Sequence, residues 1–432
     1  MRNLVVVLVI IGLVAGGFAC QGGPTVPEWI LVGVPAPLTG AYAGFGKGGR
    51  WGIEAAIADI NALGGVMVGE YGTKIKMKAI VLDTESSDTK AGTIAESLIL
   101  EDEVNFLAYG DQPPPMNAPI AAKAELHKIP YVCTTGPAEP WIGMRSAAGN
   151  WSYTWACGLF SIGEYKPEAG YTIADTWLAL LDEVGSQTNK VAGVFACDDS
   201  DGAAWHAAFP GILESKGYTV VAKAAADSLL PVETSDFSAL IDKWVDADVE
   251  VIWGNAIAPF VGTLLKQAYE NPGFHPKLIS IGRAPLFYED VSSWVGDAPL
   301  GVLVEIWWDP AWGGGSTGFG TTTPASLAER YLDDTGAEAV NRNIGAGYSV
   351  IQVLVDAIQR AGTLDPAEVN AALAATDLMT IRHRVKFDEN QFNRGPLVYG
   401  QWQKVEGKWV CPIVLSKHDF IPTTGTVLFP IP

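Results

Sequence analysis

The feature that most constrains the fold is a strand, a loop of small residues and a helix, which follow one another over residues 30–66. The stretch ILVGVPAPLTGAYAGFGKGGRWGIEAAIADINALGGV begins with an apolar strand and continues through a glycine-rich loop. The helix ends at Gly64-Gly65, and its apolar residues have the spacing of one buried stripe. These residues are Ile53, Ala56, Ile57 and Ile60. A strand that delivers a loop to a helix N-terminus forms a slightly positive concavity in which a small ligand can sit.

Strand and helix patterns then alternate along the chain, which predicts an α/β fold with covered parallel sheets. Further strands are expected at 74–83, 104–110, 129–133, 190–197, 218–223, 249–253 and 277–281. At 432 residues the chain is long enough for two domains, and two α/β halves are the simplest account of the pattern. The region after residue 301 does not extend the second half in an obvious way. Loops at the carboxyl ends of parallel strands meet at one edge, where open α/β sheets bind ligands.

Composition and charge exclude two classes of protein. Hydrophobic residues make up 48% of the chain and charged residues 18%, which is typical of a globular protein rather than a disordered one. The net charge of -20 repels phosphate backbones and anionic lipid surfaces. We therefore expect no nucleic acid partner.

The first twenty residues predict an export signal. Arg2 precedes an apolar run over residues 4–14, which is shorter than the roughly 20 residues needed to span a bilayer. Cys20 follows a small residue at the end of this segment and resembles the lipidated cysteine of bacterial lipoproteins; ordinary signal cleavage is the alternative. Residues 21–28 then form a short tether rich in Gly and Pro, and no later segment is long and apolar enough to span. We expect an exported protein of the cell envelope, either anchored by lipid or periplasmic.

The cysteines and histidines suggest no metal site. Four cysteines remain after Cys20, which permits two disulfides in an exported protein, but four buried thiols are an equal alternative. They are Cys133, Cys157, Cys197 and Cys411. None has CxxC spacing, and the five histidines are dispersed without HxH or HxxxH spacing.

Several segments together resemble the type I periplasmic solute-binding proteins of branched-chain amino acid ABC importers. They are LTGAYAGFGKGGRWGIEAAIADINALGG, VAGVFACDDSDG, DFSALIDKWVDADVEVIW, VKFDENQF and QWQKVEGKWV, and the similarity covers residues 29–410. The resemblance implies two Rossmann-like lobes joined by three hinge crossings. Lobe 1 would comprise 28–156 plus 297–387, and lobe 2 would comprise 157–296 plus 388–432. It also implies a monomer without cofactor or catalytic residues, which delivers its solute to membrane permease subunits.

The resemblance also implies which residues of lobe 1 contact the solute. They come from the glycine-rich first loop, with Phe45 and Gly46, and from the loop after the third strand, with Asp111 and Gln112. The loop after the fourth strand adds Thr134 and Thr135, whose hydroxyl groups could hold an amino acid carboxylate.

In lobe 2, the resemblance points to three more residues. The pattern Asp-x-Tyr-Gly of the family appears as Asp199-Ser200-Asp201-Gly202, and the position that helps to bind the ammonium group falls near Asn255. These departures from the family pattern leave the identity of the solute open. Tryptophans near strand ends, Trp155 and Trp307 among them, could form the aromatic walls of a site for a flat, apolar or cationic ligand, although core packing is the alternative for each.

Two further motifs lack the surroundings that their usual functions require. Residues 44–49 satisfy GxGxxG, but the first glycine comes well after the strand and no acidic residue follows at the spacing of a dinucleotide site. Residues 314–318 match GxSxG around Ser316, but a nucleophile elbow needs an immediate strand-to-helix turn. The expected function is thus capture of a small organic solute, such as an amino acid, an amide or an aromatic compound. A sensor domain that signals through a separate partner is the alternative.

Overall fold

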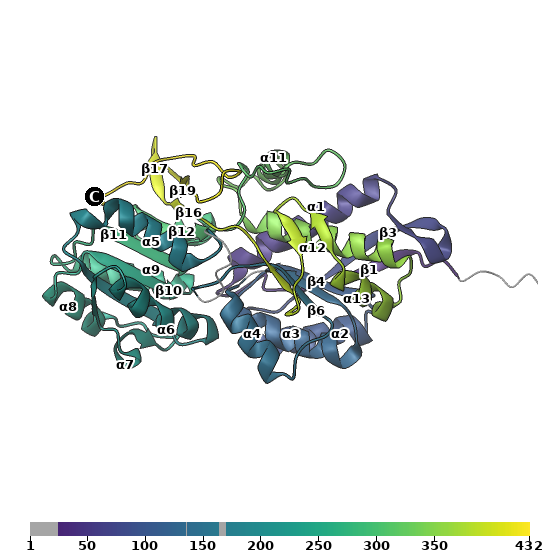
Figure 1. Cartoon of the computed structure of the whole chain (residues 1–432), viewed down its shortest axis with the longest axis horizontal. Coiled ribbons are helices and arrows are strands. Elements are labelled where there is room, and N and C mark those ends of the chain that lie inside the picture. Colours follow the sequence, from purple (N-terminus) through teal and green to yellow (C-terminus); the bar gives the residue numbers. More distant parts are fainter. Residues whose placement is uncertain (1–24, 135, 164–169) are drawn as a thin grey trace, which may run out of the picture.

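The chain folds into two α/β lobes that lie side by side (Figure 1). The structure is a computed structural model and describes residues 25–134, 136–163 and 170–432. Each lobe contains one sheet with helices on its faces. The expected two-lobed α/β fold is therefore confirmed.

The sheet of lobe 1 has the strand order β15-β6-β5-β4-β1-β3-β2. Its strands are β1 (Trp29–Ala36), β2 (Val66–Val68), β3 (Thr73–Asp83), β4 (Phe106–Asp111), β5 (Tyr131–Thr134), β6 (Thr154–Leu159) and β15 (Phe392–Arg394). All pairs are parallel except β2 with β3. The helices of this lobe are α1 (Ala43–Ala62), α2 (Asp88–Leu100), α3 (Pro114–His127), α4 (Ala138–Ala147), α11 (Pro324–Thr335), α12 (Asn343–Ala361) and α13 (Pro366–Ala374), with the short helix η1 (Gly69–Tyr71).

The sheet of lobe 2 has the order β19-β16-β12-β11-β10-β7-β8. Its strands are β7 (Val191–Cys197), β8 (Thr219–Val221), β10 (Val251–Ala256), β11 (Leu278–Arg283), β12 (Val302–Ile306), β16 (Val398–Gln401) and β19 (Ile413–Leu415), and β9 (Leu229–Leu230) pairs with β7. The helices are α5 (Ile173–Val184), α6 (Ser200–Glu214), α7 (Ala225–Ser228), α8 (Ser238–Asp246), α9 (Ala258–Glu270) and α10 (Tyr288–Val291), with η2 (Gly185–Gln187). Two small antiparallel pairs, β13 (Asp377–Met379) with β14 (Arg384–Lys386) and β17 (Gln403–Val405) with β18 (Lys408–Val410), lie outside both sheets.

The sheet to which each strand belongs shows where the chain crosses between the lobes. The chain leaves the first sheet after Leu159, leaves the second after Ile306, and crosses again between Arg394 and Val398. The sequence placed the second crossing near residue 297 and the third near 388. The structure moves both toward the C-terminus, because β12 pairs with β11 in lobe 2 and β15 pairs with β6 in lobe 1.

Helix α1 begins at Ala43, so the glycine-rich stretch expected to be a loop forms its first turns. The glycines permit close packing. A Cβ atom at Gly46 would lie 1.9 Å from the carbonyl oxygen of Pro37, and one at Gly52 would lie 2.1 Å from that of Ile344 at the start of α12. The expectation of a loop here was wrong. These glycines lie in a helix, where the lack of side chains lets its backbone pack directly on neighbouring backbone.

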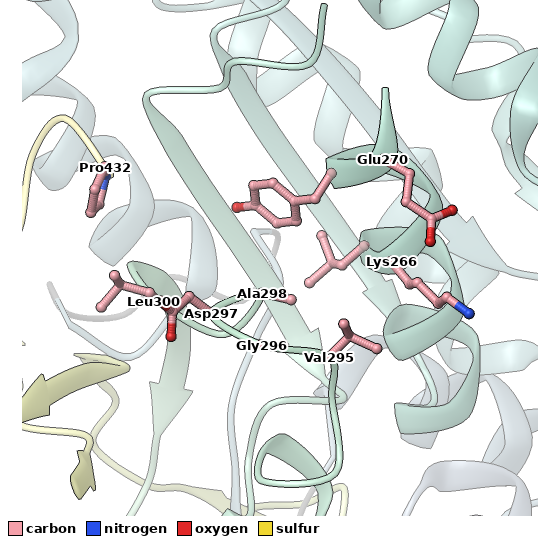
Figure 2. A pocket seen from close by; sticks show the side chains of 10 residues that line it. Lys266, Glu270, Val295, Gly296, Asp297, Ala298, Leu300 and Pro432 are labelled. Carbon is pink, nitrogen blue, oxygen red and sulfur yellow. The ribbon is translucent and has the colours of Figure 1, made fainter. Parts of the chain in front are cut away.

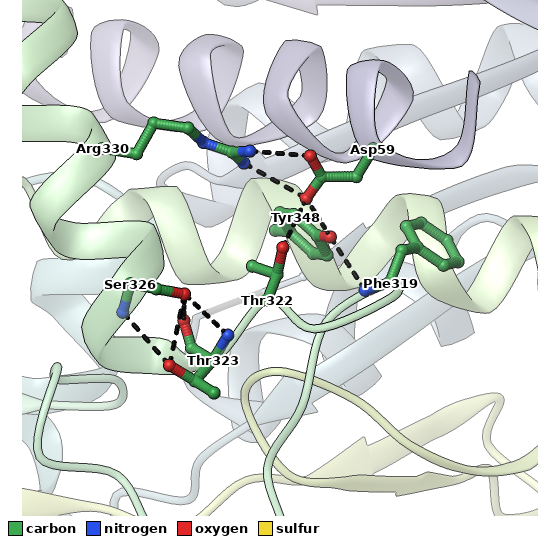
Figure 3. A network of polar contacts seen from close by, with 7 residues as sticks. All are labelled: Asp59, Phe319, Thr322, Thr323, Ser326, Arg330 and Tyr348. Carbon is green, nitrogen blue, oxygen red and sulfur yellow. Dashed lines mark hydrogen bonds and ion pairs between the residues drawn. The ribbon is translucent and has the colours of Figure 1, made fainter. Parts of the chain in front are cut away.

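A polar network joins α1 to α12 and to the segment before α11 (Figure 3). Asp59 accepts hydrogen bonds from Arg330 at 2.7 Å, from Tyr348 at 2.6 Å and from Thr322 at 2.8 Å. Burial would raise the pKa of Asp59, but these bonds outweigh it and lower the pKa. The network therefore holds the returning segment of the chain on lobe 1.

The remaining expectations of the sequence concern cysteines, metals and membranes. None of the four cysteines in the described residues forms a disulfide bond, so all four are free thiols. Cys20 lies outside the described residues. Within the described ranges, no group of three His, Cys, Asp or Glu side chains could hold a metal ion, and no helix is both long and apolar enough to cross a membrane.

Candidate functional site

Residues of both lobes enclose a small cavity at the carboxyl ends of the strands. Lobe 1 contributes Phe45, Gln112, Pro113, Pro114, Gly136 and Pro137, lobe 2 contributes Asp201, Trp205, Asn255, Arg283, Leu286 and Glu305, and the crossings contribute Phe160 and Trp307. The cavity measures about 20 Å³, which holds about one water molecule. Phe45 of α1 meets Phe287 of lobe 2 edge to face, with 4.8 Å between the ring centroids. The lobes are therefore closed on each other.

A larger hollow of about 450 Å³ lies on the surface of lobe 2 (Figure 2). Its walls come from α9, the segment 295–300 and Pro432, all within one lobe. Its charged side chains, Lys266, Glu270 and Asp297, reach into solvent, and none of the unpaired buried polar atoms among the described residues lies in it. The interlobe cavity is smaller but has the polar groups of a binding site.

Arg283 organises the polar side of the interlobe cavity. Its Nη1 atom donates to Asp199 at 2.7 Å, its Nη2 atom to the Cys197 sulfur at 2.7 Å, and its Nε atom lies 3.4 Å from Asp201. Arg283 is the last residue of β11, and Asp199 caps α6 by accepting from the Gly202 amide. The carboxyl ends of two strands and the start of one helix thus meet here.

Two buried carboxyl groups line the cavity beside Arg283. Burial raises the pKa of Asp201, Arg283 opposes the rise and Asp199 adds to it. Burial also raises the pKa of Glu305 to about 8, against a hydrogen bond of 3.1 Å from the backbone amide of Arg283. Glu305 therefore holds its proton at neutral pH in this closed state.

Four side chains in the cavity wall have polar atoms without a hydrogen-bond partner. They are the amide oxygen of Gln112, both amide atoms of Asn255, the Nε atom of Arg283 and the indole nitrogen of Trp307. The Asn255 side chain lies close enough to Asp201 to lower the pKa of that carboxyl. Since each of the four residues is at most 5% exposed, water cannot satisfy these atoms from outside. Unpaired buried polar atoms are costly unless a ligand completes them.

Aromatic rings form the rest of the wall. The rings of Phe160 and Trp307 stack with 5.9 Å between centroids, and Trp205 meets Phe160 edge to face at 6.3 Å. The Trp205 indole donates to Asp201 at 3.0 Å, which joins the aromatic side of the wall to the acidic one.

Of the residues expected at the site, the structure brings five together in the cavity wall: Phe45, Gln112, Asp201, Asn255 and Trp307. Asp199 does not line the cavity but accepts a hydrogen bond from Arg283, which does. Three others lie elsewhere. Gly46 packs on Pro37, the Thr134 hydroxyl is bonded to Arg382, and the Trp155 indole donates to Asn370 at 2.7 Å. The Asp111 side chain and Thr135 lie outside the described residues.

Sequence reasoning missed five residues of the wall: Phe160, Trp205, Arg283, Leu286 and Glu305. A signal existed for three of them. Arg283 and Glu305 stand at or near the carboxyl ends of β11 and β12, where ligand loops were expected, and Trp205 is one helical turn after Asp201. The GxSxG motif does not reach the cavity. Ser316 lies in the long connection between β12 and α11, and its hydroxyl donates to the Arg382 carbonyl at 3.4 Å.

Comparison with known proteins agrees with this architecture. Residues 30–406 match the family described as periplasmic binding protein. The chain is 25% identical over 420 residues to Leu/Ile/Val-binding protein homolog 2 of Brucella abortus, which covers 92% of this chain and 97% of the relative. It is 23% identical over 380 residues to the leucine-, isoleucine-, valine-, threonine- and alanine-binding protein of Pseudomonas aeruginosa, covering 84% and 86%. These relatives are binding proteins, in agreement with the expectation of no enzyme.

Solved structures with the same fold include a leucine-binding protein of Thermotoga maritima, with a TM-score of 0.69 and 20% identity over 90% of this chain and 99% of that one. A solute-binding protein of an ABC transporter from Rhodopseudomonas palustris, in complex with 3,4-dihydroxybenzoic acid, has a TM-score of 0.68 and 19% identity over 92% and 99%. The fold, the family match and the interlobe cavity agree. The chain belongs to the periplasmic binding protein family.

Proposed function

We propose that the protein is the extracytoplasmic solute-binding component of an ABC importer, which captures a small organic solute by closing its lobes. The observation that carries the proposal is the interlobe wall of Gln112, Asn255 and Trp307, each of which has at least one polar atom without a partner in the closed state. A solute that pairs with these atoms contacts both lobes only when they are closed. This differential contact shifts the population toward the closed form.

The surrounding features support a role outside the cytoplasm. The relatives are named as binding proteins for amino acids, and one solved structure of this fold holds an aromatic acid. The signal-like residues 1–20 fit an exported protein, and lipidation of Cys20 would keep it near permease subunits in the membrane. An amino acid, an amide or an aromatic compound of similar size is the class of solute we propose.

The test is a thermal-shift screen of amino acids, amides and aromatic compounds, followed by small-angle scattering with each hit. A ligand at 100 times its dissociation constant should stabilise the folded state by about 2.7 kcal/mol. We expect hits to increase the closed fraction and so to reduce the radius of gyration, or to leave it at the closed value.

Two variants locate the binding site. Asn255→Ala removes an unpaired side chain of the cavity and should weaken binding of every hit at least tenfold, whereas Lys266→Ala changes the surface hollow of lobe 2 and should not. A hit whose affinity responds to Lys266→Ala and not to Asn255→Ala would contradict the proposal.

A further inference from the structure

We propose that the short helix α10 of lobe 2 is an acidic latch on lobe 1, and that this latch holds the lobes closed more firmly when Asp290 carries a proton. A solute between the lobes is then held more tightly at mildly acidic pH than at mildly alkaline pH. The inference rests on the proposed function, since it names a control on the same closure. The contacts of α10, the surroundings of Asp290 and the charges at this contact carry it.

Helix α10 and the residue before it contact two separate parts of lobe 1. Phe287 meets Phe45 of α1 edge to face, with 4.8 Å between the ring centroids. The Tyr288 hydroxyl donates a hydrogen bond to Glu338, which lies between α11 and α12. Both contacts join one lobe to the other, so they exist only while the lobes are closed.

Asp290 lies against the backbone of α1 in this contact. A Cβ atom at Gly44 would be 3.0 Å from the Oδ2 atom of Asp290, so the carboxyl group packs where only a glycine leaves space. Asp290 is half-buried, and within the described parts of the chain its carboxyl group accepts no hydrogen bond. A groove of about 420 Å³, shared by Gly40 and Ala41 of lobe 1 with α9, reaches Asp290 and lets it exchange protons with water. Lobe 1 therefore covers the carboxyl group without offering it a partner, which disfavours its charged form.

Charged groups of three elements face Asp290. Burial raises the pKa of Asp290 to about 7, Glu289 of α10 adds to the rise, and Lys47 of α1 opposes it. Lys266 of α9 lines the same groove, and both lysines are exposed to water, which screens their attraction for the carboxylate. An aspartate in water has a pKa of about 4. Closing the lobes at neutral pH therefore takes up a proton at Asp290, and this contribution to closure is lost as the pH rises through about 7.

Two further carboxyl groups belong to the same contact. One oxygen of Glu289 is buried and has no hydrogen-bond partner. Burial raises the pKa of Tyr331 in α11 to about 12, and Glu289 adds to that rise, so this carboxyl group also acts on lobe 1. Glu338 of lobe 1 accepts from the Tyr288 hydroxyl. An ionised Asp290 would be the third carboxylate at this contact, and a proton on Asp290 relieves the repulsion.

The first experiment titrates Asp290 in the full chain without any solute. The carboxyl carbon resonance of Asp290, identified by its loss in Asp290→Asn, should have its midpoint near pH 7. Gly44→Ala opens the contact, since its Cβ atom would lie 2.5 Å from the Phe287 ring and 3.0 Å from the Asp290 carboxyl group. We expect a larger radius of gyration and a midpoint lower by at least one pH unit, whereas Gly211→Ala, with nothing within 4 Å of the new Cβ atom, should change neither. The same midpoint in both glycine variants would overturn the latch.

The second experiment measures capture by calorimetric titration at pH 6 and at pH 8. Leucine and 4-hydroxybenzoate are the first probes, followed by the hits of the thermal-shift screen. A carboxyl group with a pKa of about 7 in the closed form and about 4 in the open form weakens closure about tenfold between these pH values. Asp201 and Glu305 titrate in the same range, so the prediction concerns a comparison of two proteins. The ratio of Kd at pH 8 to Kd at pH 6 should be about tenfold smaller in Asp290→Asn than in the wild type. Asp182→Asn, at an exposed aspartate of α5, is the matched control and should keep the wild-type ratio.

A third variant tests the sign of the effect. Lys47→Gln removes the exposed cation that opposes protonation, so the midpoint of Asp290 should move to higher pH, and a move to lower pH would overturn the latch. If a probe binds and the ratio of its Kd values is the same in wild type and Asp290→Asn, solute capture stands and the inference is overturned. If no compound binds at either pH, the proposed function fails, whereas the titration of Asp290 in Gly44→Ala still decides whether α10 is a latch.

Discussion

At the scale of single residues, three buried carboxyl groups have a protonation state that depends on folding: Asp201 and Glu305 in the interlobe cavity and Asp290 outside it. Burial raises the pKa of Glu305 to about 8 and that of Asp290 to about 7, and it raises that of Asp201 as well. In an unfolded chain such groups have pKa values of about 4. Between pH 5 and 8 these carboxyl groups therefore bind more protons in the folded chain than in the unfolded one, whereas His206 and His383, whose pKa burial lowers, bind fewer in the folded chain below about pH 6.5.

This difference gives a prediction for stability. Above about pH 6.5, where the histidines no longer oppose the carboxyl groups, the free energy of unfolding should fall as the pH rises to about 8, by about 1.4 kcal/mol per pH unit for each carboxyl group that is still protonated in the folded state. Denaturant unfolding at several pH values measures the slope. Glu305→Gln should make it shallower, and a slope equal to that of the wild type would contradict the pKa shift of Glu305.

The residues of the site were only partly predictable from the sequence. Asn255, Gln112 and Phe45 were expected at the site from the family resemblance, and all three lie in the cavity wall. Thr134 could not be excluded, because only the fold brings Arg382, which is 248 residues away, to its hydroxyl. Glu305 was missed because the second crossing was placed before its strand rather than after it.

At the scale of elements, the contact of α1 with α12 depends on glycine. The glycine-rich segment from Gly44 to Gly49 was expected to be a loop because composition alone does not distinguish glycines of a turn from glycines of a packed helix. The contacts make the distinction: a Cβ atom at Gly48 would meet the Asn341 side chain, and one at Gly347 of α12 would lie 2.2 Å from the Gly49 carbonyl oxygen. The strands, in contrast, were predictable, since β1, β7 and β10 are buried apolar runs in a covered sheet.

A pair of glycine variants tests this packing. Gly52→Ala would place a Cβ atom 2.1 Å from the Ile344 carbonyl oxygen, so we expect a loss of about 1–3 kcal/mol in the free energy of unfolding. Gly211→Ala is the control: it lies inside α6 with nothing within 4 Å of the new Cβ atom, and should gain about 0.5–1 kcal/mol from helix propensity. Chemical denaturation measures both. Equal effects of the two changes would show that α1 tolerates a side chain at this contact.

At the scale of the whole molecule, Arg382 joins two of the three crossings. It lies in the turn between β13 and β14 and is fully buried. Its guanidinium group donates to the Trp307 carbonyl at 3.0 Å on the second crossing, and to the Gly158 carbonyl at 3.0 Å and the Cys157 carbonyl at 3.3 Å where the first crossing begins. These crossings share one anchor, which sets the relative position at which the lobes close.

Replacing this anchor should affect both stability and closure. Arg382→Met fills the same space but leaves carbonyl groups of both crossings unpaired, and each buried polar group that loses its partner costs about 1–3 kcal/mol. We expect lower stability in denaturant and, under native conditions, a larger radius of gyration by small-angle scattering. Arg384→Met, two residues along, removes an exposed pair with Asp377 and should cost at most about 1 kcal/mol without changing the radius. If the two variants scatter alike, closure does not depend on the buried arginine, and direct contacts between the lobes, such as Phe45 with Phe287 and α3 and α4 with α6, are sufficient for it.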